Sequence, residues 1–196
     1  YLAKRGNTLL SQPIKGTARR SSDEEEDEAI KQSLAQSEKE RAENVMIVDL
    51  VRNDLTRCAL PGTVQVDELF GVYSFTQVHQ LISTISCQVA PEQTFSNILK
   101  VTFPMGSMTG APKIRAMQLI EQYERSKRGV YSGSVGYIQP NGDFDFNVII
   151  RSMLYNANTK YLSFQVGGAI TAKSIPEEEY EECLLKAKAI GQVLGL

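Results

Sequence analysis

The sequence predicts a fold that mixes α-helices with β-strands. Apolar residues recur at helical spacing between Asp27 and about Asn53, and again after Pro176. Residues 129–166 instead predict an antiparallel meander, because β-branched and aromatic stretches there are separated by turn residues such as Pro140–Asp143. With 196 residues and 42% hydrophobic content, the chain can bury a sizeable core, and we expect one domain over residues 1–196.

The composition argues against several classes of protein. The 21 Lys and Arg against 23 Asp and Glu give a net charge of −2, which does not fit a nucleic-acid-binding surface. The 3 cysteines are scattered without CxxC spacing, so a disulfide framework or zinc site is not expected and a reducing compartment fits. No apolar run approaches the roughly 20 residues of a membrane span. We therefore expect a cytoplasmic protein that binds neither nucleic acids nor membranes.

The N-terminal half predicts a hairpin followed by a long helix. Gly6-Asn7 is a turn between two short extended segments. Residues 19–28 contain SSDEEEDE and are expected to form a mobile acidic loop, although Ser22 also suits a helix start. The following helix is expected from Asp27 to about Asn53. Residues 45–51 could be helix or strand, because the spacing of their apolar residues does not distinguish the two.

The remaining elements follow from period and turn residues. Strands are expected at 64–66, 71–75 and 78–89, followed by helices at 95–101 and 114–125. The meander should comprise strands 130–139, 144–155 and 161–166, and Pro176 should open the last helix.

A loop of small residues precedes the helix at 114–125. Gly106 and Thr109 lie in the segment FPMGSMTGAPKIRAM, and Pro112 stands at the helix start. The free amides of a helix start, with Lys113 and Arg115 nearby, predict an anion site. Because Pro112 replaces the glycine of GxxxxGK[ST], a carboxylate fits better than a nucleotide phosphate. The alternative is a plain junction between loop and helix.

Several charged residues recur at spacings that place them on common faces. Glu40 and Glu43 lie three apart on one helix, whereas Glu179, Glu182 and Lys186 share a face of the last helix. Exposed acids and an ordinary ion pair would explain both patterns. Arg151 lies in an apolar stretch, where a buried charge must be paired or functional. The expected meander places Tyr131 and Arg151 on adjacent strands.

Five blocks of sequence together resemble the chorismate-utilising enzymes, which include anthranilate, aminodeoxychorismate, isochorismate and salicylate synthases. The blocks are PIKGT (13–17), KERAENVMIVDLVRNDL (39–55), FPMGSMTGAPKIRAM (103–117), YSGSVGY (131–137) and PEEEYEECLLKA (176–187). The resemblance spans essentially the whole chain. It implies an α+β fold in which antiparallel β-sheets carry helices packed on the outside.

The resemblance also implies a magnesium ion held by glutamates. The matching ligands are Glu43 and Glu182, with Glu40 and Glu179 as companion carboxylates. A hard divalent cation prefers such oxygen ligands and can accept a substrate carboxylate as well.

Chorismate would be held by residues from three of the blocks and from the segment between the last two. By the same match, Tyr131, Arg151 and the backbone of Gly167 would hold the enolpyruvyl carboxylate. Gly106, Thr109 and Lys186 would surround the ring and its metal-bound carboxylate.

Lys15 distinguishes members of the family. Aminodeoxychorismate synthases carry lysine in the PIxGT block, whereas anthranilate synthases carry alanine. The resemblance therefore implies that Lys15 is a nucleophile in the amination of chorismate to 4-amino-4-deoxychorismate, which feeds p-aminobenzoate and folate. Its amine must be neutral, which requires burial or nearby cations. Ammonia would come from a glutamine amidotransferase. The alternatives are anthranilate synthase component I and a non-catalytic chorismate-binding module.

Two departures from the family pattern qualify these expectations. Many relatives have histidine where this chain has Gln80, and His79, one place earlier on a strand, points to the opposite face. The family's Ser-Pro-Glu block would lie before Tyr1. We therefore expect a chain truncated on its N-terminal side, impaired or inactive alone, that forms a homodimer through uncovered sheet edges.

Overall fold

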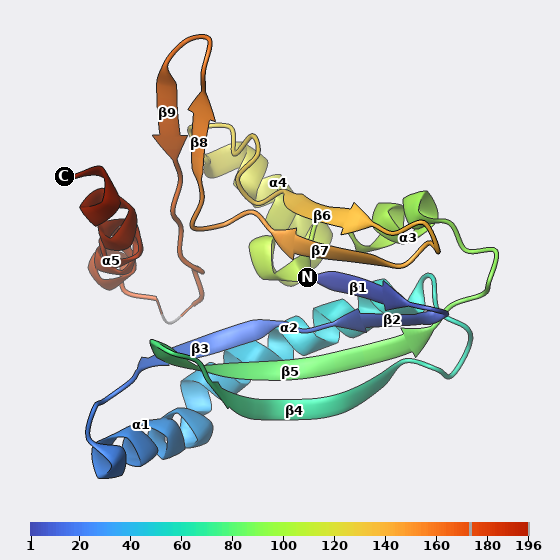
Figure 1. Cartoon of the computed structure of the whole chain (residues 1–196), viewed down its shortest axis with the longest axis horizontal. Coiled ribbons are helices and arrows are strands. Elements are labelled where there is room, and N and C mark those ends of the chain that lie inside the picture. Colours follow the sequence, from blue (N-terminus) through green and yellow to red (C-terminus); the bar gives the residue numbers. More distant parts are fainter. Residues whose placement is uncertain (173, 196) are drawn as a thin grey trace. The chain divides into compact units, whose positions relative to one another are not determined.

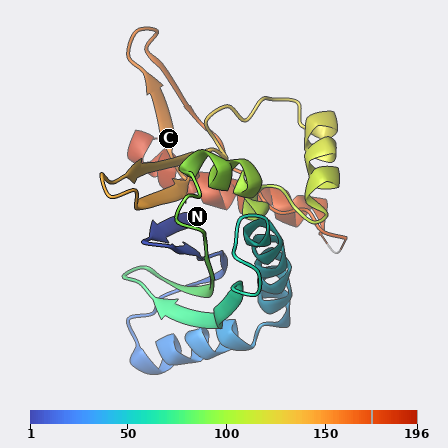
Figure 2. The same cartoon turned by 90° about the vertical axis from the view of Figure 1, so that its right-hand side faces the viewer.

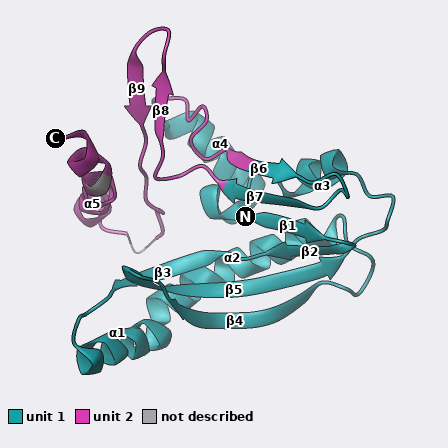
Figure 3. Cartoon of the chain, viewed as in Figure 1, with its two compact units in different colours: residues 1–125, 136–147 teal, residues 126–135, 148–196 magenta. Residues whose placement is uncertain are grey.

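The described part of the chain forms two compact units. The computed structural model describes residues 1–172 and 174–195. Residues 1–125 and 136–147 make up unit 1, and residues 126–135 and 148–196 make up unit 2 (Figure 3). The expected domain over residues 1–196 therefore contains two units, each with its own internal contacts.

Unit 1 is built on a mostly antiparallel sheet. Its strands, among the described residues, are β1 (Leu2–Arg5), β2 (Thr8–Ser11), β3 (Ile14–Arg19), β4 (Gln65–Ser74), β5 (Val78–Gln88), β6 (Ser134–Ile138) and β7 (Phe144–Val148). They are ordered β3-β5-β2-β1-β7-β6, with β4 on the other edge of β5 (Figure 1). Because β2 pairs with residues 85–88 of β5 and β3 with residues 78–82, two short strands line one edge of the long one.

The expected hairpin at Gly6 is confirmed, whereas the expected strand 144–155 is two strands. Gly6 has φ 56°, which the turn between β1 and β2 requires. After β7 the chain bends at residues 149–152, where Arg151 adopts φ 52°. This left-handed residue interrupts the strand, so β8 (Met153–Asn156) pairs instead with β9 (Tyr161–Phe164) in a separate sheet.

The helices of the described residues are α1 (Glu24–Gln36), α2 (Glu38–Thr56), α3 (Phe95–Thr102), α4 (Lys113–Tyr123) and α5 (Pro176–Leu194), with a 3₁₀ turn η1 (Gly106–Met108). The expected helix from Asp27 to Asn53 is divided at Ser37, whose ψ of 109° is extended. The Ser37 hydroxyl accepts a hydrogen bond from the amide of Glu40 and caps α2. The open segment at residues 45–51 is helical.

The acidic run belongs mostly to α1. Asp23 caps the helix by accepting a hydrogen bond from the amide of Glu26 at 2.8 Å, and residues 24–27 form its first turn. Carboxylates are favourable there because they face the positive end of the helix dipole. The expected acidic loop at 19–28 is thus limited to residues 20–23, since residue 19 ends β3.

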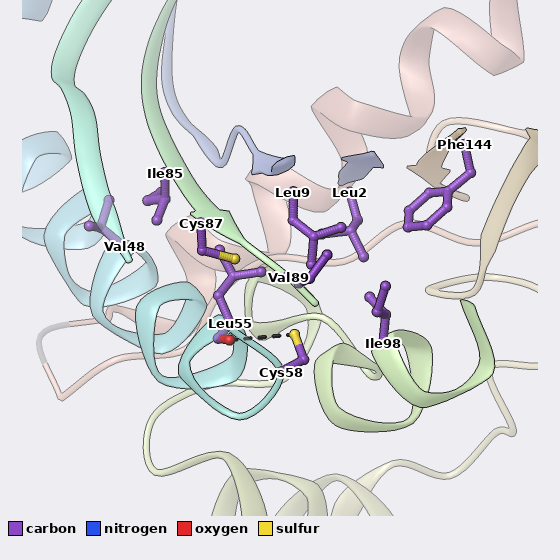
Figure 4. Packing of buried hydrophobic residues seen from close by; sticks show 10 residues of the cluster. All are labelled: Leu2, Leu9, Val48, Leu55, Cys58, Ile85, Cys87, Val89, Ile98 and Phe144. Carbon is purple, nitrogen blue, oxygen red and sulfur yellow. Dashed lines mark hydrogen bonds between the residues drawn. The ribbon is translucent and has the colours of Figure 1, made fainter. Parts of the chain in front are cut away.

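One hydrophobic core fixes α2 against the sheet of unit 1. Most residues of β5 are buried, including consecutive ones, and α2 runs beside β3 and β5 (Figures 1 and 2). Figure 4 shows the cluster, which combines residues of α2 and β5, and of the turns that follow them, with residues of β1, β2, α3 and β7: Leu2, Leu9, Val48, Leu55, Cys58, Ile85, Cys87, Val89, Ile98 and Phe144. This packing holds α2 against β5, the strand with which β3 pairs.

Unit 2 contains β8, β9 and α5 together with the segment 126–135. Within the described residues no helix has both the length and the apolar character that a membrane crossing demands. The expected fold class is confirmed: antiparallel sheets and helices are combined in an α+β architecture.

Candidate active site

Lys15 lies at an irregularity of β3. The register with β5 shifts between Ile14 and Thr17, and Gly16 has φ 87°. Such bulges redirect the side chains beside them. The Lys15 amine lies 3.8 Å from a carboxylate oxygen of Glu43, and the two side chains are 20% and 23% exposed. The neighbouring charge is therefore an acid, whereas we expected burial or a nearby cation to keep the amine neutral.

Glu40 approaches the same irregularity from α2. A Cβ atom placed on Gly16 would lie 3.1 Å from Oε2 of Glu40 and 3.2 Å from Cδ1 of Leu34. The spacing of three residues places Glu40 and Glu43 on one face of α2, as expected, and the structure directs that face at β3. Lys15 and two of the four candidate glutamates come together in unit 1.

The loop before α4 packs directly on α2. A Cβ atom on Gly106 would lie 3.0 Å from Cβ of Leu50, so a glycine is needed for this approach. Pro112 is the N-cap of α4, and the first amides of the helix lack intrahelical acceptors. The Thr109 hydroxyl donates to the carbonyl of Met105 at 3.2 Å. The loop retains the amides of an anion site, but the hydroxyl is engaged within the loop.

Lys113 is paired with Asp54 of α2. Its amine donates to Oδ2 of Asp54 at 2.6 Å, and the side chains are 15% and 7% exposed. The positive charge that we expected at the anion loop is therefore matched by a buried acid. No local pattern in the sequence indicates this pair, because the two residues are 59 positions apart. A lysine at the first position of a helix is unfavourable, because it lies at the positive end of the helix dipole. A lysine in that position therefore suggests an acidic partner nearby.

In unit 2, α5 and the glycine segment bring four predicted residues together. Lys186 donates to the carbonyl of Gly167 at 3.1 Å and to a carboxylate oxygen of Glu182. A Cβ atom on Gly167 would lie 3.0 Å from the Tyr131 hydroxyl. The Tyr131 side chain thus lies close to the Gly167 backbone, and Lys186 forms an ion pair with Glu182, four residues earlier on the helix.

Glu179 lies one helical turn before Glu182. It accepts a hydrogen bond from the Ser174 hydroxyl at 2.7 Å, and a Cβ atom on Gly168 would lie 3.1 Å from its Oε2. The Glu179 and Glu182 carboxylates therefore lie beside the Gly167-Gly168 segment, within one unit.

Arg151 and Tyr131 occupy positions that differ from the expected ones. Tyr131 is in the turn before β6, and Arg151 lies in the bend between β7 and β8, so neither is on a strand. Arg151 is exposed, and the argument from a buried charge does not apply to it. The backbone segments that carry them are still hydrogen-bonded to each other. The amide of Ser132, next to Tyr131, donates to the carbonyl of Ile149, two residues before Arg151, at 2.9 Å.

His79 has a structural position. It is 1% exposed, with Nδ1 at 2.8 Å from the Ser74 hydroxyl and Nε2 at 3.0 Å from Oδ1 of Asp27. Gln80 points to the opposite face of β5, as strand alternation requires. His79 is therefore engaged in structural contacts and does not take the place of Gln80.

The candidate metal ligands fit a hard cation by their chemistry. They are carboxylates, and both Glu43 and Glu182 already have a lysine amine as their neighbour, which shows that each position accommodates positive charge. Glu40 and Glu43 belong to unit 1, whereas Glu179 and Glu182 belong to unit 2. Across the described residues, no three acidic, histidine or cysteine side chains form a group that would hold a metal ion alone. Oxygen donors of this kind suit Mg²⁺.

The sequence is similar to curated proteins of chorismate metabolism. It is 46% identical to an aminodeoxychorismate synthase of Arabidopsis thaliana, covering 94% of this chain and 20% of the relative. Aminodeoxychorismate synthase component 1 of Bacillus subtilis is 38% identical over 100% of this chain and 41% of its own length. Anthranilate synthase component 1 of Aquifex aeolicus is 42% identical, over 96% of this chain and 38% of the relative.

Solved structures show the same fold. Anthranilate synthase component I from Streptococcus pneumoniae matches with a TM-score of 0.79 and 37% identity, covering 95% of this chain and 40% of that one. A putative isochorismate synthase from Bacillus anthracis matches with a TM-score of 0.83 and 25% identity, covering 100% and 52%. The chain spans less than half the length of the curated relatives that it matches. Since the profile of the family described as chorismate binding enzyme matches residues 1–192, the chain belongs to that family.

Proposed function

We propose that this chain is the catalytic part of an enzyme that aminates chorismate to 4-amino-4-deoxychorismate, with Lys15 as the nucleophile. The observation that carries the proposal is the position of Lys15 at the β3 irregularity, beside Glu43 and one residue from Gly16, which packs on Glu40. Relatives that are 44–47% identical to the chain are named aminodeoxychorismate synthase, which supports the same reaction.

In the proposed reaction, the neutral amine of Lys15 attacks the ring carbon beside the carboxylate-bearing carbon. A carbon–nitrogen bond forms, the conjugated double bonds shift, and the ring hydroxyl leaves with the displaced electron pair. Ammonia then attacks the vacated carbon, the electrons shift back, and the bond to Lys15 breaks. The lysine is regenerated after proton loss from the new amine. Covalent catalysis of this kind divides one difficult displacement into two easier steps.

The substrate would be held through its carboxylates. Tyr131, Arg151 and the backbone amide of Gly167 would bind the enolpyruvyl carboxylate, and Lys186 lies beside the same glycine. Gly106 and Thr109 belong to the loop whose helix-start amides favour an anion. These residues would orient the ring so that the carbon under attack faces the Lys15 amine.

A magnesium ion is part of the proposal. Glu43 and Glu182 would hold it, with Glu40 and Glu179 as second carboxylates. When bound, such a cation would stabilise the negative charge of the substrate carboxylate. The lysines now beside Glu43 and Glu182 would then compete with the cation for those oxygens.

Ammonia is proposed to come from a glutamine amidotransferase. The name component 1 that the Bacillus subtilis relative bears supports a second component. A cytoplasmic location is likewise proposed, because the three cysteines lack the spacing of a disulfide framework and are free thiols. The plant relatives are named chloroplastic.

Intact mass spectrometry after incubation with chorismate and Mg²⁺, without ammonia, tests the nucleophile. We expect the mass of the protein to increase by one dehydrated chorismate residue, and Lys15→Ala to abolish the increase. Lys4→Ala serves as the control because Lys4 is another lysine of the same sheet. If neither this chain nor a chain extended through the Ser-Pro-Glu block forms an adduct, the covalent mechanism is wrong.

Anthranilate synthase is the second candidate. Two relatives of that name are 42% and 43% identical to this chain. Lys15 favours aminodeoxychorismate synthase, because the family resemblance implies alanine at this position in anthranilate synthases. Products formed by the extended chain with ammonia distinguish the two, since anthranilate is aromatic and has lost the enolpyruvyl group. An extended chain without any turnover would favour a non-catalytic chorismate-binding module.

We also propose that this chain alone is impaired and forms a homodimer through sheet edges. Within the described residues, β4 pairs only with β5 and β6 only with β7, so each leaves an edge. Val135, Tyr137 and Ile138 of β6 are more than half exposed, at 59%, 55% and 52%. Exposed apolar edges are sites at which a second chain can add.

A further inference from the structure

We propose that Asp54 and Lys113 form a positioning pair that sets the loop 103–112 against α2. The inference rests on the proposed function, in which this loop contacts the substrate. All groups involved belong to unit 1.

The loop is attached to α2 at two points. At the first point, Gly106 packs so closely on Leu50 that an added Cβ would lie 3.0 Å from the Leu50 Cβ. At the second point, directly after the loop, Lys113 opens α4 and donates to Asp54 at 2.6 Å. The segment between the two points has few other places to lie, because the two contacts reduce its backbone freedom.

Both attachment points lie on the face of α2 that carries Glu43. Leu50 follows Glu43 by seven residues and Asp54 follows Leu50 by four, so the three positions fall on one stripe of the helix. An α-helix is a rigid rod over this length. The placement of the loop relative to Glu43, and hence relative to Lys15, therefore depends on the two attachments.

The pair is costly, which favours a role in specificity over one in stability. Asp54 is 5% exposed, and burial raises the pKa of its carboxyl although Lys113 is hydrogen-bonded to it. Lys113 also faces the unfavourable end of its helix dipole. Apolar side chains at both positions would fill the space without these costs, and buried pairs can be replaced in this way without loss of stability.

Hydrogen exchange measured by mass spectrometry tests the pair. In Asp54→Asn and in Lys113→Met, we expect the amides of residues 103–112 to exchange about tenfold faster, since a charged hydrogen bond is lost. The amides of β5 should keep their parental rates. Asp49→Asn is the matched control, because Asp49 forms an exposed ion pair with Arg52 on the same helix.

The double variant Asp54→Leu/Lys113→Met separates positioning from a merely structural role. We expect it to be as stable to denaturant as the parent, while the loop amides still exchange faster. This variant also decides the question if the single variants do not fold. Parental exchange of the loop in any folded variant of the pair would overturn the proposal, as would an equal acceleration in β5.

Chorismate titration keeps this inference distinct from the proposed function. If the parent chain binds chorismate, we expect the dissociation constant to rise about tenfold in Asp54→Asn and to stay unchanged in Asp49→Asn. If the parent chain and the extended chain both fail to bind, the proposed substrate is wrong, whereas the exchange result still decides whether the pair positions the loop. An unchanged dissociation constant in a folded Asp54→Asn would contradict the positioning role.

Discussion

At the scale of single residues, the backbone conformation of Gly16 determines where the Lys15 side chain leaves β3. Its φ of 87° lies in a region that residues with a Cβ rarely adopt, and Leu34 and Glu40 fill the space beside it. Lys15 therefore leaves the strand at a point where the backbone is locally irregular and closely covered by α1 and α2.

Gly16→Ala should destabilise the protein more than Gly142→Ala does. Both glycines have positive φ, 87° and 84°, but nothing lies within 4 Å of a Cβ at Gly142. We expect Gly142→Ala to cost about 1 kcal/mol of unfolding free energy through its backbone alone, and Gly16→Ala to cost a further ~1 kcal/mol or more through overpacking. Urea denaturation measures both. Equal losses of unfolding free energy in the two variants would show that α1 and α2 move to make room for the added methyl group.

At the scale of elements, α1 is fastened to the β4–β5 hairpin by a polar cluster. Asp27 accepts hydrogen bonds from Arg20 at 2.9 and 3.0 Å, and its Oδ1 lies 3.0 Å from the Nε2 of His79. Arg20 also donates to the carbonyl of Phe75 at 2.8 Å. Because Ser37 joins α1 directly to α2, this cluster also constrains the start of the helix that carries Glu40 and Glu43.

The polar cluster around Asp27 predicts that the folded protein loses stability in acid. The Arg20 guanidinium, with the amide of Ser21 and then His79, holds the pKa of Asp27 well below its usual range. A lowered native pKa stabilises the fold above the unfolded value of about 4, and this contribution is lost as the pH falls below it. Asp27→Asn should therefore lower the urea midpoint at pH 7, and its difference from the parent should shrink towards pH 2.

Glu25→Gln is the control for this measurement, because Glu25 is an exposed acid in the same helical turn. Its urea midpoint should stay near that of the parent at both pH values. If the difference between Asp27→Asn and the parent is as large at pH 2 as at pH 7, the cluster does not carry the acid dependence.

At the scale of the whole molecule, the proposed homodimer would use the open edges of the sheet. The chain matches relatives that are more than twice its length, and β4 and β6 each pair on one side only among the described residues. An edge with exposed apolar side chains offers unpaired backbone groups to another strand. Natural sheets usually protect such edges with charge.

Light scattering coupled to size-exclusion chromatography tests this proposal. We expect a dimer whose fraction increases with protein concentration. Val135→Lys on β6 or Val66→Lys on β4 should produce a monomer, according to which edge is used, because an edge lysine opposes pairing. A monomer at all concentrations in the parent chain, or a dimer that persists in both variants, would contradict association through these edges.

The sequence by itself determined the features that depend on near neighbours in the chain. Helical spacing placed Glu40 with Glu43 and Glu182 with Lys186, and the turn residues located the hairpin at Gly6. These features follow from local periods and from the φ that glycine permits. The five sequence blocks likewise indicated the family, which the comparison over residues 1–192 confirmed.

Only the tertiary structure decided the contacts between distant residues. Asp54 and Lys113 are 59 positions apart, and Asp27 and His79 are 52 apart, so no local pattern joins them. The break of the long helix at Ser37 and the split of the strand near Arg151 were also missed. At Ser37 the break lies within the polar run 36–41, and near Arg151 apolar residues continue on both sides, so neither sequence marks the break. Packing against the sheet or departure from it determines where the backbone leaves its regular path.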